Sequence, residues 1–399
     1  MASLKYWLWL TGRKGIGTLT AVRLLDAFGT PEAAYFADQE EYDRVEGLSA
    51  VGKQSLADKS LTGAEQILAD CDRLGLRLLT LQDAEYPERL RNIPDPPLLL
   101  YAKGKLPPID EELVVGVVGT RDPSPYGEKM AREITHDLAR AGCVICSGIA
   151  RGLDTIALRT ALNEGAAVIS VVAGGLDVPY PKENRWLYDD VAAAGVLLSE
   201  YPPGVPSLGE HYRPRNRIIS GLSEGVLVVE GGLTSGTLIT AHAALEQGKE
   251  VFAVPGNVDA PKSAAPNRLI QAHEAQLVRS AADILEEFSA RYPLKMARPA
   301  LTQEEKNQRL EGAQATPMAE PRLPKPEKPL MPSEEQRSLT DDQRDLLLAT
   351  ETRPRHPDEL VEETQIPARR VLSALTLLQV RGYIKEEAGK RFSALVRLN

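Results

Sequence analysis

The chain has 399 residues, of which 43% are hydrophobic and 26% are charged. At roughly 100–200 residues per domain, this length predicts about two to four folded domains, and the apolar fraction excludes wholesale disorder. The 47 basic and 56 acidic residues give a net charge of −9, which argues against a generally basic nucleic-acid-binding protein. Any site for a polyanion must therefore be a local basic patch on an acidic protein.

The sequence predicts a cytoplasmic protein without a membrane span. Its longest uncharged stretch, residues 165–176, is far shorter than the ~20 residues that cross a bilayer. The apolar run at residues 6–10 is too short for the core of a signal peptide and is followed by Arg13 and Lys14. The three cysteines, an odd and small number, argue against a disulfide scaffold and favour a reducing compartment.

Residues 1–70 are predicted to form a small helical domain. Two glycine-containing turns, residues 15–17 and 47–52, are each followed by a helix-like run, at residues 21–28 and 53–58. Two helices joined by such a hairpin, as in domains of the SAM or helix-hairpin-helix kind, can present backbone N–H groups to a phosphate. The same glycines can also serve as helix caps in a plain bundle, which is the favoured interpretation.

Residues 71–290 are predicted to form a doubly wound, Rossmann-like α/β core. Short apolar runs alternate there with amphipathic stretches of helix length, which indicates a parallel sheet covered on both faces. Residues 72–108 are expected to add one or two strands at its edge. The predicted strands are residues 113–118, 143–147, 167–173, 196–199, 225–229 and 250–254, and the predicted helices are residues 126–141, 154–164, 183–194, 216–222 and 235–247.

Residues 291–338 are predicted to be a semi-extended linker. They hold eight prolines and no aromatic residue beyond Tyr292, and such a segment cannot bury enough apolar surface to offset its ordering entropy. Beyond it, residues 339–399 show three helix-like runs and a hairpin pattern, which together are typical of a winged-helix domain. The predicted helices are residues 339–349, 357–364 and 368–381, and the hairpin strands are residues 382–385 and 391–397.

The third helix of this predicted winged-helix domain opens with Arg369 and Arg370, which makes DNA contact possible. Four glutamates, at positions 362, 363, 386 and 387, dilute the basic face. Protein binding or packing is therefore favoured over DNA contact for this domain.

Glycines, hydroxyl residues and arginines follow the predicted core strands. Because ligands of a doubly wound sheet bind at the carboxyl ends of its strands, these residues share the functional edge. Glycine lets backbone N–H groups approach a phosphate, serine and threonine add donors, and arginine matches phosphate in charge and geometry. The motifs are Gly119–Arg121, Ser147–Asp154, Gly174–Asp177, Glu230–Thr237 and Pro255–Asn257. Together they predict a site for an anion or a nucleotide.

Residues 206–222 supply the predicted basic patch. They contain three arginines against one glutamate, and Tyr212 beside them offers a flat face on which a base could stack. In the competing interpretation, the strand-end glycines only make tight turns and the arginines are neutralised by acidic residues. The pairs would then join Arg215 or Arg217 with Glu200 or Glu230.

The sequence predicts no metal site, cofactor site or disulfide. It has no Gly-x-x-x-x-Gly-Lys-Ser/Thr loop for ATP hydrolysis, and residues 15–17 lack both the third glycine and the preceding strand of a dinucleotide fingerprint. Cys143 and Cys146 lie in a predicted strand, where residues three apart face opposite sides, so we expect them in the core. The five histidines show no metal-ligand spacing.

Seven motifs in the α/β core resemble, in the same order, those of the DNA-processing DprA (Smf) family. The family pattern includes Val-Gly-Ser-Arg, Ser-Gly-Leu-Ala-x-Gly-Ile-Asp and Arg-Asn-Arg-Ile-Ile-Ser-Gly-Leu-Ser. The motifs stand here at residues 118–121, 147–154, 175–181, 199–204, 215–223, 235–241 and 251–256. The helical N-terminus and the winged-helix C-terminus are similar to those of the longer family members.

The resemblance implies a recombination mediator and not an enzyme. Family members bind incoming single-stranded DNA in natural transformation, shield it from nucleases, help load the recombinase RecA onto it, and form homodimers through the α/β core. Carried over motif by motif, the resemblance implies DNA contacts at Arg121, Ser147, Gly148, Arg151, Lys182, Tyr212, Arg215, Asn216, Arg217, Ser235, Gly236 and Thr237.

The chain departs from the family pattern at three places. Leu158 stands where members usually carry a histidine. After the last core strand, Pro266 and His273-Glu274, with one extra residue, replace glycines that permit close backbone approach to a ligand. Residues 208–210 lack the basic residue that often precedes the aromatic.

Two other functions fit parts of the sequence. Nucleotide phosphoribohydrolases of the lysine-decarboxylase-like fold carry a Gly-Gly-x-Gly-Thr-x-x-Glu signature that is similar to residues 232–240. Thr240 stands at the position of the closing glutamate and cannot act as a carboxylate base. A winged-helix transcription regulator with a small-molecule sensor core would leave the run of arginines unexplained.

Overall fold

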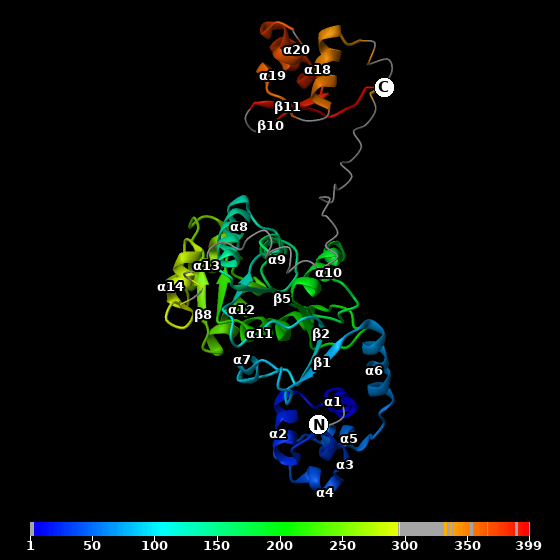
Figure 1. The fold of residues 1–399 in the computed structure, drawn as a ribbon. Coiled ribbons are helices and arrows are strands. Elements are labelled where there is room, and N and C mark those ends of the chain that lie inside the picture. Colours follow the sequence, from blue (N-terminus) through cyan, green and yellow to red (C-terminus); the bar gives the residue numbers. More distant parts are fainter. Residues whose placement is uncertain are drawn as a thin grey trace. The chain divides into compact units, whose positions relative to one another are not determined.

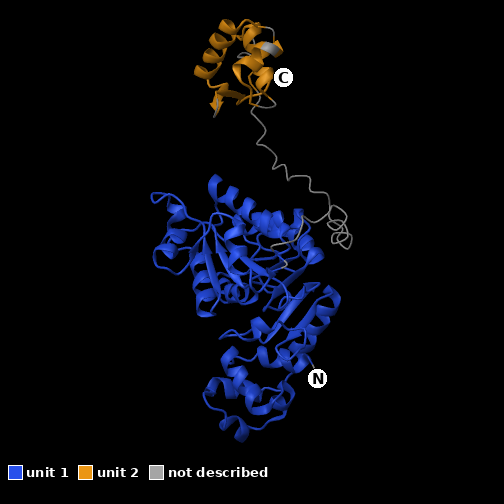
Figure 2. Ribbon diagram, turned by 60° about the vertical axis from the view of Figure 1, so that its left-hand side comes forward, with its two compact units in different colours: residues 1–315 blue, residues 316–399 orange. Residues whose placement is uncertain are grey.

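The computed structural model describes residues 4–293, 295, 331–332, 336, 338–351, 354–364, 366–387 and 390–398. The chain forms two compact units, residues 1–315 and 316–399, which Figure 2 shows in different colours. Most of the predicted linker, residues 296–330, lies outside the described residues. The division of the chain into four parts at residues 70, 290 and 338 stays a prediction.

Short helices form the N-terminal part of the first unit. They are α1 (Leu4–Thr11), α2 (Thr18–Phe28), α3 (Pro31–Phe36), α4 (Gln39–Asp43), α5 (Ala50–Ala57) and α6 (Thr62–Leu74). The two glycine turns lie against each other, since a Cβ atom on Gly15 would come within 3.2 Å of the backbone nitrogen of Gly52. The φ angle of Gly15 is +78°, in the region that glycine adopts without strain. Ser49 caps α5 by accepting the N–H of Gly52.

A nine-stranded sheet forms the centre of the first unit (Figure 1). Its strand order is β1-β2-β6-β5-β4-β3-β7-β8-β9, with β3 to β9 parallel and β1 and β2 antiparallel at one edge. The strands are β1 (Arg77–Thr80), β2 (Leu99–Gly104), β3 (Val114–Val118), β4 (Val144–Ser147), β5 (Val168–Val171), β6 (Val196–Ser199), β7 (Gly225–Val228), β8 (Glu250–Ala253) and β9 (Gln276–Leu277). The predicted doubly wound core and its added edge strands are confirmed. The two-residue β9, which is exposed and carries no apolar run, was not predicted.

The order of the strands reverses beside β3. From β3 the sheet continues through β4, β5 and β6 on one side, whereas β7, β8 and β9 lie on the other. At such a switch point the loops after two neighbouring strands leave in opposite directions and open a crevice at the carboxyl ends. The loops concerned here are residues 119–121 after β3 and residues 230–237 after β7.

Helices cover both faces of the sheet. In Figure 1, α8 (Pro125–Arg140), α9 (Leu153–Asn163) and α10 (Arg185–Ala194) lie on one side of it, and α11 (Tyr212–Leu222) and α12 (Gly236–Glu246) lie on the other. Each side has its own apolar core. The remaining elements of the unit are α7 (Glu88–Arg91), α13 (Ala264–Gln271), α14 (Ala281–Glu287) and the 3₁₀ turns η1 (Lys182–Asn184), η2 (Gly209–His211) and η3 (Pro261–Ser263).

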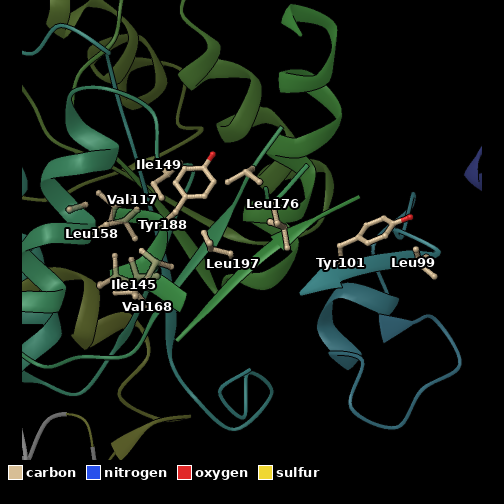
Figure 3. Close-up of a cluster of buried hydrophobic side chains, with 14 of the residues drawn as sticks. Leu99, Tyr101, Val117, Ile145, Ile149, Leu158, Val168, Leu176, Tyr188 and Leu197 are labelled. Carbon is tan, nitrogen blue, oxygen red and sulfur yellow. The ribbon is translucent and has the colours of Figure 1, made fainter. Parts of the chain in front are cut away.

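Figure 3 shows part of the core under α8, α9 and α10, with Val117 and Ile145 from the sheet and Leu158 from α9. Leu158 is fully buried and therefore serves as a packing residue where the family pattern has a histidine. Cys143 belongs to this core and Cys146 to the opposite one, as their spacing along a strand predicts.

The second unit is a winged-helix domain. Its elements are α18 (Asp341–Glu351), α19 (Pro357–Thr364), α20 (Ala368–Val380), β10 (Ile384–Glu387) and β11 (Arg391–Ala394). Leu346, Leu360 and Leu375, one from each helix, are buried together against Ile384 of the antiparallel hairpin. On α20, Arg369 and Arg370 are both exposed, and Arg370 forms an ion pair with Asp342 at 2.7 Å.

Candidate nucleic-acid interface

The crevice at the switch point is a cavity of 380 Å³, which we call the switch-point cavity. The loops after β3 and β7 and the first turns of α11 and α12 line it. The lining residues are Val118, Gly119, Thr120, Arg121, Ala150, Asp154, Tyr212, Arg215, Asn216, Ile219, Gly232, Thr234, Ser235, Gly236, Thr237 and Thr240. Motifs that lie more than 100 residues apart in the sequence therefore meet at one place.

Two arginines lie close to the Tyr212 ring on one wall of the cavity. The guanidinium of Arg121 is 4.9 Å from the centroid of the Tyr212 ring, and that of Arg215 is 5.6 Å away. Burial raises the pKa of the Tyr212 phenol, and the two arginines oppose that rise, so at neutral pH the phenol is an uncharged donor. Arg121 is exposed and forms no ion pair within the described part of the chain, which leaves its charge available to a ligand.

The N-terminus of α12 forms a second wall of the cavity. Ser235 caps this helix by accepting the N–H of Thr237 at 3.2 Å, and the hydroxyls of the two residues are 2.8 Å apart. Gly236 is exposed, and an added Cβ atom would meet nothing within 4 Å. The glycine therefore has no packing role, and it leaves the backbone N–H groups and the positive end of the helix dipole open to an anion.

Arg215 and Asp154 form the buried floor of the cavity. Nη1 of Arg215 donates to the carbonyl oxygens of Gly148, at 2.8 Å, and Val171. Asp154 accepts the backbone N–H groups of Gly148 at 3.2 Å and of Ala150 at 3.4 Å. Burial raises the pKa of the Asp154 carboxyl and lowers that of Arg215, and the opposite charge of each group counteracts the shift in the other. A Cβ atom on Gly148 would lie 2.0 Å from Nη1 of Arg215, so this position requires glycine.

Of three further predicted contact residues, Asn216 lines the cavity, whereas Ser147 and Gly148 do not. Ser147 is fully buried and donates its hydroxyl to the carbonyl oxygen of Val117 at 2.7 Å, so its side chain is not presented to a ligand. Gly148 lies under Arg215. Asn216 lines the cavity with 8% of its surface exposed, and its amide nitrogen is 3.4 Å from the carbonyl oxygen of Gly236.

Arg217 is not brought into the switch-point cavity. Its Nε donates to Asp95 at 3.0 Å and its Nη2 to Glu200 at 2.8 Å, and its side chain is only 14% exposed. The predicted helix begins at residue 216, but α11 begins at Tyr212. On a helix, residues two apart point in nearly opposite directions, which separates Arg217 from Arg215. The competing interpretation, a pair between Arg217 and Glu200, describes this residue correctly.

Arg151 and Lys182 lie outside the cavity lining, on exposed positions beside it. Arg151 pairs with Glu183, and both side chains are largely exposed. Lys182 forms no ion pair among the described residues. Both stay predicted contacts for a ligand that extends beyond the cavity.

The strand-end motifs contain Thr120, Asp154 and Thr234, which line the cavity, but none of the three was named as a contact residue. The strand order would have singled them out, because they follow or face the two strands at the switch point. The departures at Leu158, Pro266 and His273 lie away from the cavity, since none of them lines it. His273 has a φ angle of +58°, the conformation that a glycine there would favour.

The described residues offer neither a metal site nor a membrane span. They contain no group of three or more histidine, cysteine, aspartate or glutamate side chains placed to hold a metal ion. No helix among them is long and apolar enough to span a membrane.

Comparison with known proteins identifies the family. A family model described as DNA recombination-mediator protein A matches residues 77–289, and one described as the DprA winged helix domain matches residues 327–390. Protein Smf from Synechocystis is 31% identical over 398 residues, which cover 97% of this chain and 98% of that protein. DNA processing protein DprA from Bacillus subtilis is 43% identical over 226 residues, which cover 57% of this chain and 76% of that protein.

A solved structure agrees with the sequence comparisons. The chain is similar to the X-ray structure of DNA processing protein A from Streptococcus pneumoniae, with a TM-score of 0.64 and 33% identity. The match covers 72% of this chain and 99% of that one. The resemblance noted in the sequence is therefore confirmed: the chain belongs to the DprA (Smf) family of DNA recombination mediators.

Proposed function

We propose that the protein binds single-stranded DNA in the switch-point cavity, without chemical conversion of the strand. One observation carries this proposal: the flat Tyr212 ring, with two arginines beside it, lines the same cavity as the capped, open N-terminus of α12. The first wall can stack a base, and the second can hold the adjacent phosphate. A duplex keeps its bases stacked inside, so it cannot offer a base to Tyr212.

The cavity lacks a free carboxylate base, which argues against hydrolysis. Asp154 is the one carboxylate among the lining residues, and it is buried and committed to two backbone N–H groups. Thr240, at the position of the catalytic glutamate in phosphoribohydrolases, lines the cavity with 2% of its surface exposed and offers only a hydroxyl. Binding is therefore the activity that these side chains support.

A titration of the intact chain with labelled oligonucleotides tests this proposal. We expect tighter binding of a single strand than of the matching duplex, and an affinity that falls as the salt concentration rises. Equal affinity for the two forms would refute the role assigned to Tyr212. Binding that is independent of salt would refute the phosphate contacts.

We further propose that the protein, as a homodimer in the cytoplasm, protects incoming single strands and helps to load RecA onto them during natural transformation. Its membership of a recombination-mediator family supports this role. Two measurements check it: survival of a labelled single strand during nuclease digestion, and the rate of RecA filament assembly on that strand. Unchanged digestion and unchanged assembly in the presence of the protein would each contradict the corresponding step.

A further inference from the structure

We propose that a bound single strand leaves the switch-point cavity over the N-terminal end of α10, where Tyr180 stacks a base and Arg185 holds a phosphate. This inference rests on the proposed function and adds the direction that the strand takes. We call Tyr180, Lys182 and Arg185 the exit platform. All three side chains are exposed, and none of them lines the cavity itself.

Tyr180 presents an exposed ring on a fixed backbone. Its side chain is 48% exposed, while Tyr188 beneath it is buried. The hydroxyl of Tyr188 accepts the N–H of Tyr180 and donates to its carbonyl oxygen, each at 3.2 Å. Tyr180 thus offers a second fixed aromatic ring, of the kind on which successive bases stack.

The turn that carries the exit platform is attached to the wall of the cavity. Asn184 is buried, and its amide nitrogen donates to the carbonyl oxygen of Ile149 at 2.9 Å and to the hydroxyl of Thr155 at 2.8 Å. Ala150, which follows Ile149, lines the cavity. The platform is thus held in register with the cavity before DNA binds, so little ordering entropy is lost on binding.

Sheet order gives the strand two possible exits, and charge distinguishes them. β5, which leads to the exit platform, lies two strands from β3 on one side, and β8 lies two strands from β3 on the other. Lys182 and Arg185 form no ion pair in the described part of the chain. On the β8 side, Lys262 is paired with Asp122 at 2.8 Å. Phosphates are attracted by the net charge, so they favour the side with unpaired cations.

The β8 side supplies a matched control. Tyr126 is exposed there to a similar degree, 42%, beside a second hollow that it lines together with Pro255. The inference assigns a base to Tyr180 and none to Tyr126. The experiment therefore compares Tyr180→Ala with Tyr126→Ala in the full chain, after denaturant unfolding has verified that both variants are folded. Tyr180→Phe keeps the ring and serves as a control: it separates loss of the stacking surface from a change in the backbone of this turn.

Each variant is titrated with two fluorescent probes, a thymidine trinucleotide that fits the cavity alone and a longer oligothymidine of about 12 nucleotides. Loss of one stacked base should weaken binding of the longer probe roughly tenfold in Tyr180→Ala. We expect the trinucleotide affinity to stay unchanged, Tyr180→Phe to bind like the parent chain, and Tyr126→Ala to bind both probes normally. Arg185→Ala should make the salt dependence shallower by about 0.7 in the log–log slope, whereas Lys262→Ala should not.

Two outcomes would overturn the inference. If Tyr126→Ala weakens binding of the longer probe and Tyr180→Ala does not, the strand leaves the cavity over β8. If Tyr180→Ala weakens binding of the trinucleotide as much as binding of the longer probe, Tyr180 supports the structure of the cavity and does not contact the strand outside it. Failure of the proposed function is distinguishable from both, because the parent chain would then bind neither probe in preference to a duplex.

Discussion

Arg121 and Arg217 come from the same predicted set of DNA contacts, yet the structure gives them opposite roles. Replacing Arg121 by alanine removes an exposed, unpaired guanidinium beside Tyr212. A hydrogen bond to a charged group contributes about 1.5–3 kcal/mol, so affinity for a single strand should fall by roughly 10- to 150-fold. The log–log salt slope should become shallower by about 0.7. Stability should change little, because a cation–π contact at an exposed site contributes about 0.5–1 kcal/mol.

Replacing Arg217 by alanine should instead damage the fold. The substitution leaves the Glu200 carboxylate, whose side chain is 19% exposed, without its partner at 2.8 Å. Removing one partner of a buried ion pair lowers the free energy of unfolding by about 3–5 kcal/mol. A urea titration measures this loss as a lower unfolding midpoint. The salt slope of DNA binding should stay that of the parent chain, since this guanidinium does not reach the cavity.

The Arg217→Ala variant should also show a distinctive pH dependence. Burial raises the pKa of Glu200, and Arg217 is the main group that lowers it, so its removal raises that pKa further. A group whose pKa is higher in the folded than in the unfolded state stabilises the fold at low pH and loses that contribution as pH rises through the folded value. The stability that Arg217→Ala loses relative to the parent chain should therefore be smallest below about pH 4.3, the ordinary glutamate pKa, and should grow as the pH rises toward neutrality. A variant with unchanged stability and a shallower salt slope would refute the assignment of Arg217.

The other substitutions and the thiols give further tests. Asp154→Ala should destabilise the first unit by about 1–3 kcal/mol in a denaturant titration, because it leaves the buried N–H groups of Gly148 and Ala150 without their acceptor. Gly236→Ala should leave the unfolding midpoint unchanged or slightly higher, since the new Cβ atom meets nothing within 4 Å, but should weaken single-strand binding by blocking close approach to α12. Burial raises the pKa values of Cys143 and Cys146 to about 12, so a thiol reagent at about pH 8 should label them only after denaturant is added.

The fold was largely readable from the sequence because parallel strands in a covered sheet are short, apolar and separated by amphipathic helices. Val196–Ser199 matches its predicted bounds, and the other core strands differ at their ends by one or two residues. The strand order was not readable, since sequence alone does not say on which side of β3 a later strand joins the sheet. For the same reason the prediction placed the ligand at the carboxyl ends without locating the switch point.

The candidate site was predictable where a residue is positioned by its own strand or helix end. Arg121 follows β3 and Gly236 begins α12, and both lie in the cavity. The prediction failed to separate Arg215 from Arg217 because it did not extend α11 back to Tyr212. On this helix, the Arg215 guanidinium lies at the floor of the cavity, and the Arg217 guanidinium donates to two carboxylates. This difference depends on the tertiary structure.

The charges around the cavity also limit how strongly salt can affect binding. Arg121, Lys182, Arg185 and Arg213 are exposed cations here that form no ion pair among the described residues, whereas Arg215 is buried near Asp154 and Arg217 is paired with Glu200. At about 0.7 per phosphate, four such contacts predict a log–log slope of about −3 per protomer, shallower than that of a generally cationic groove. The rest of the affinity must then come from stacking and from backbone and hydroxyl donors fixed by the fold, which salt screens weakly. A measured slope steeper than about −4 would show that cations outside this set hold the strand.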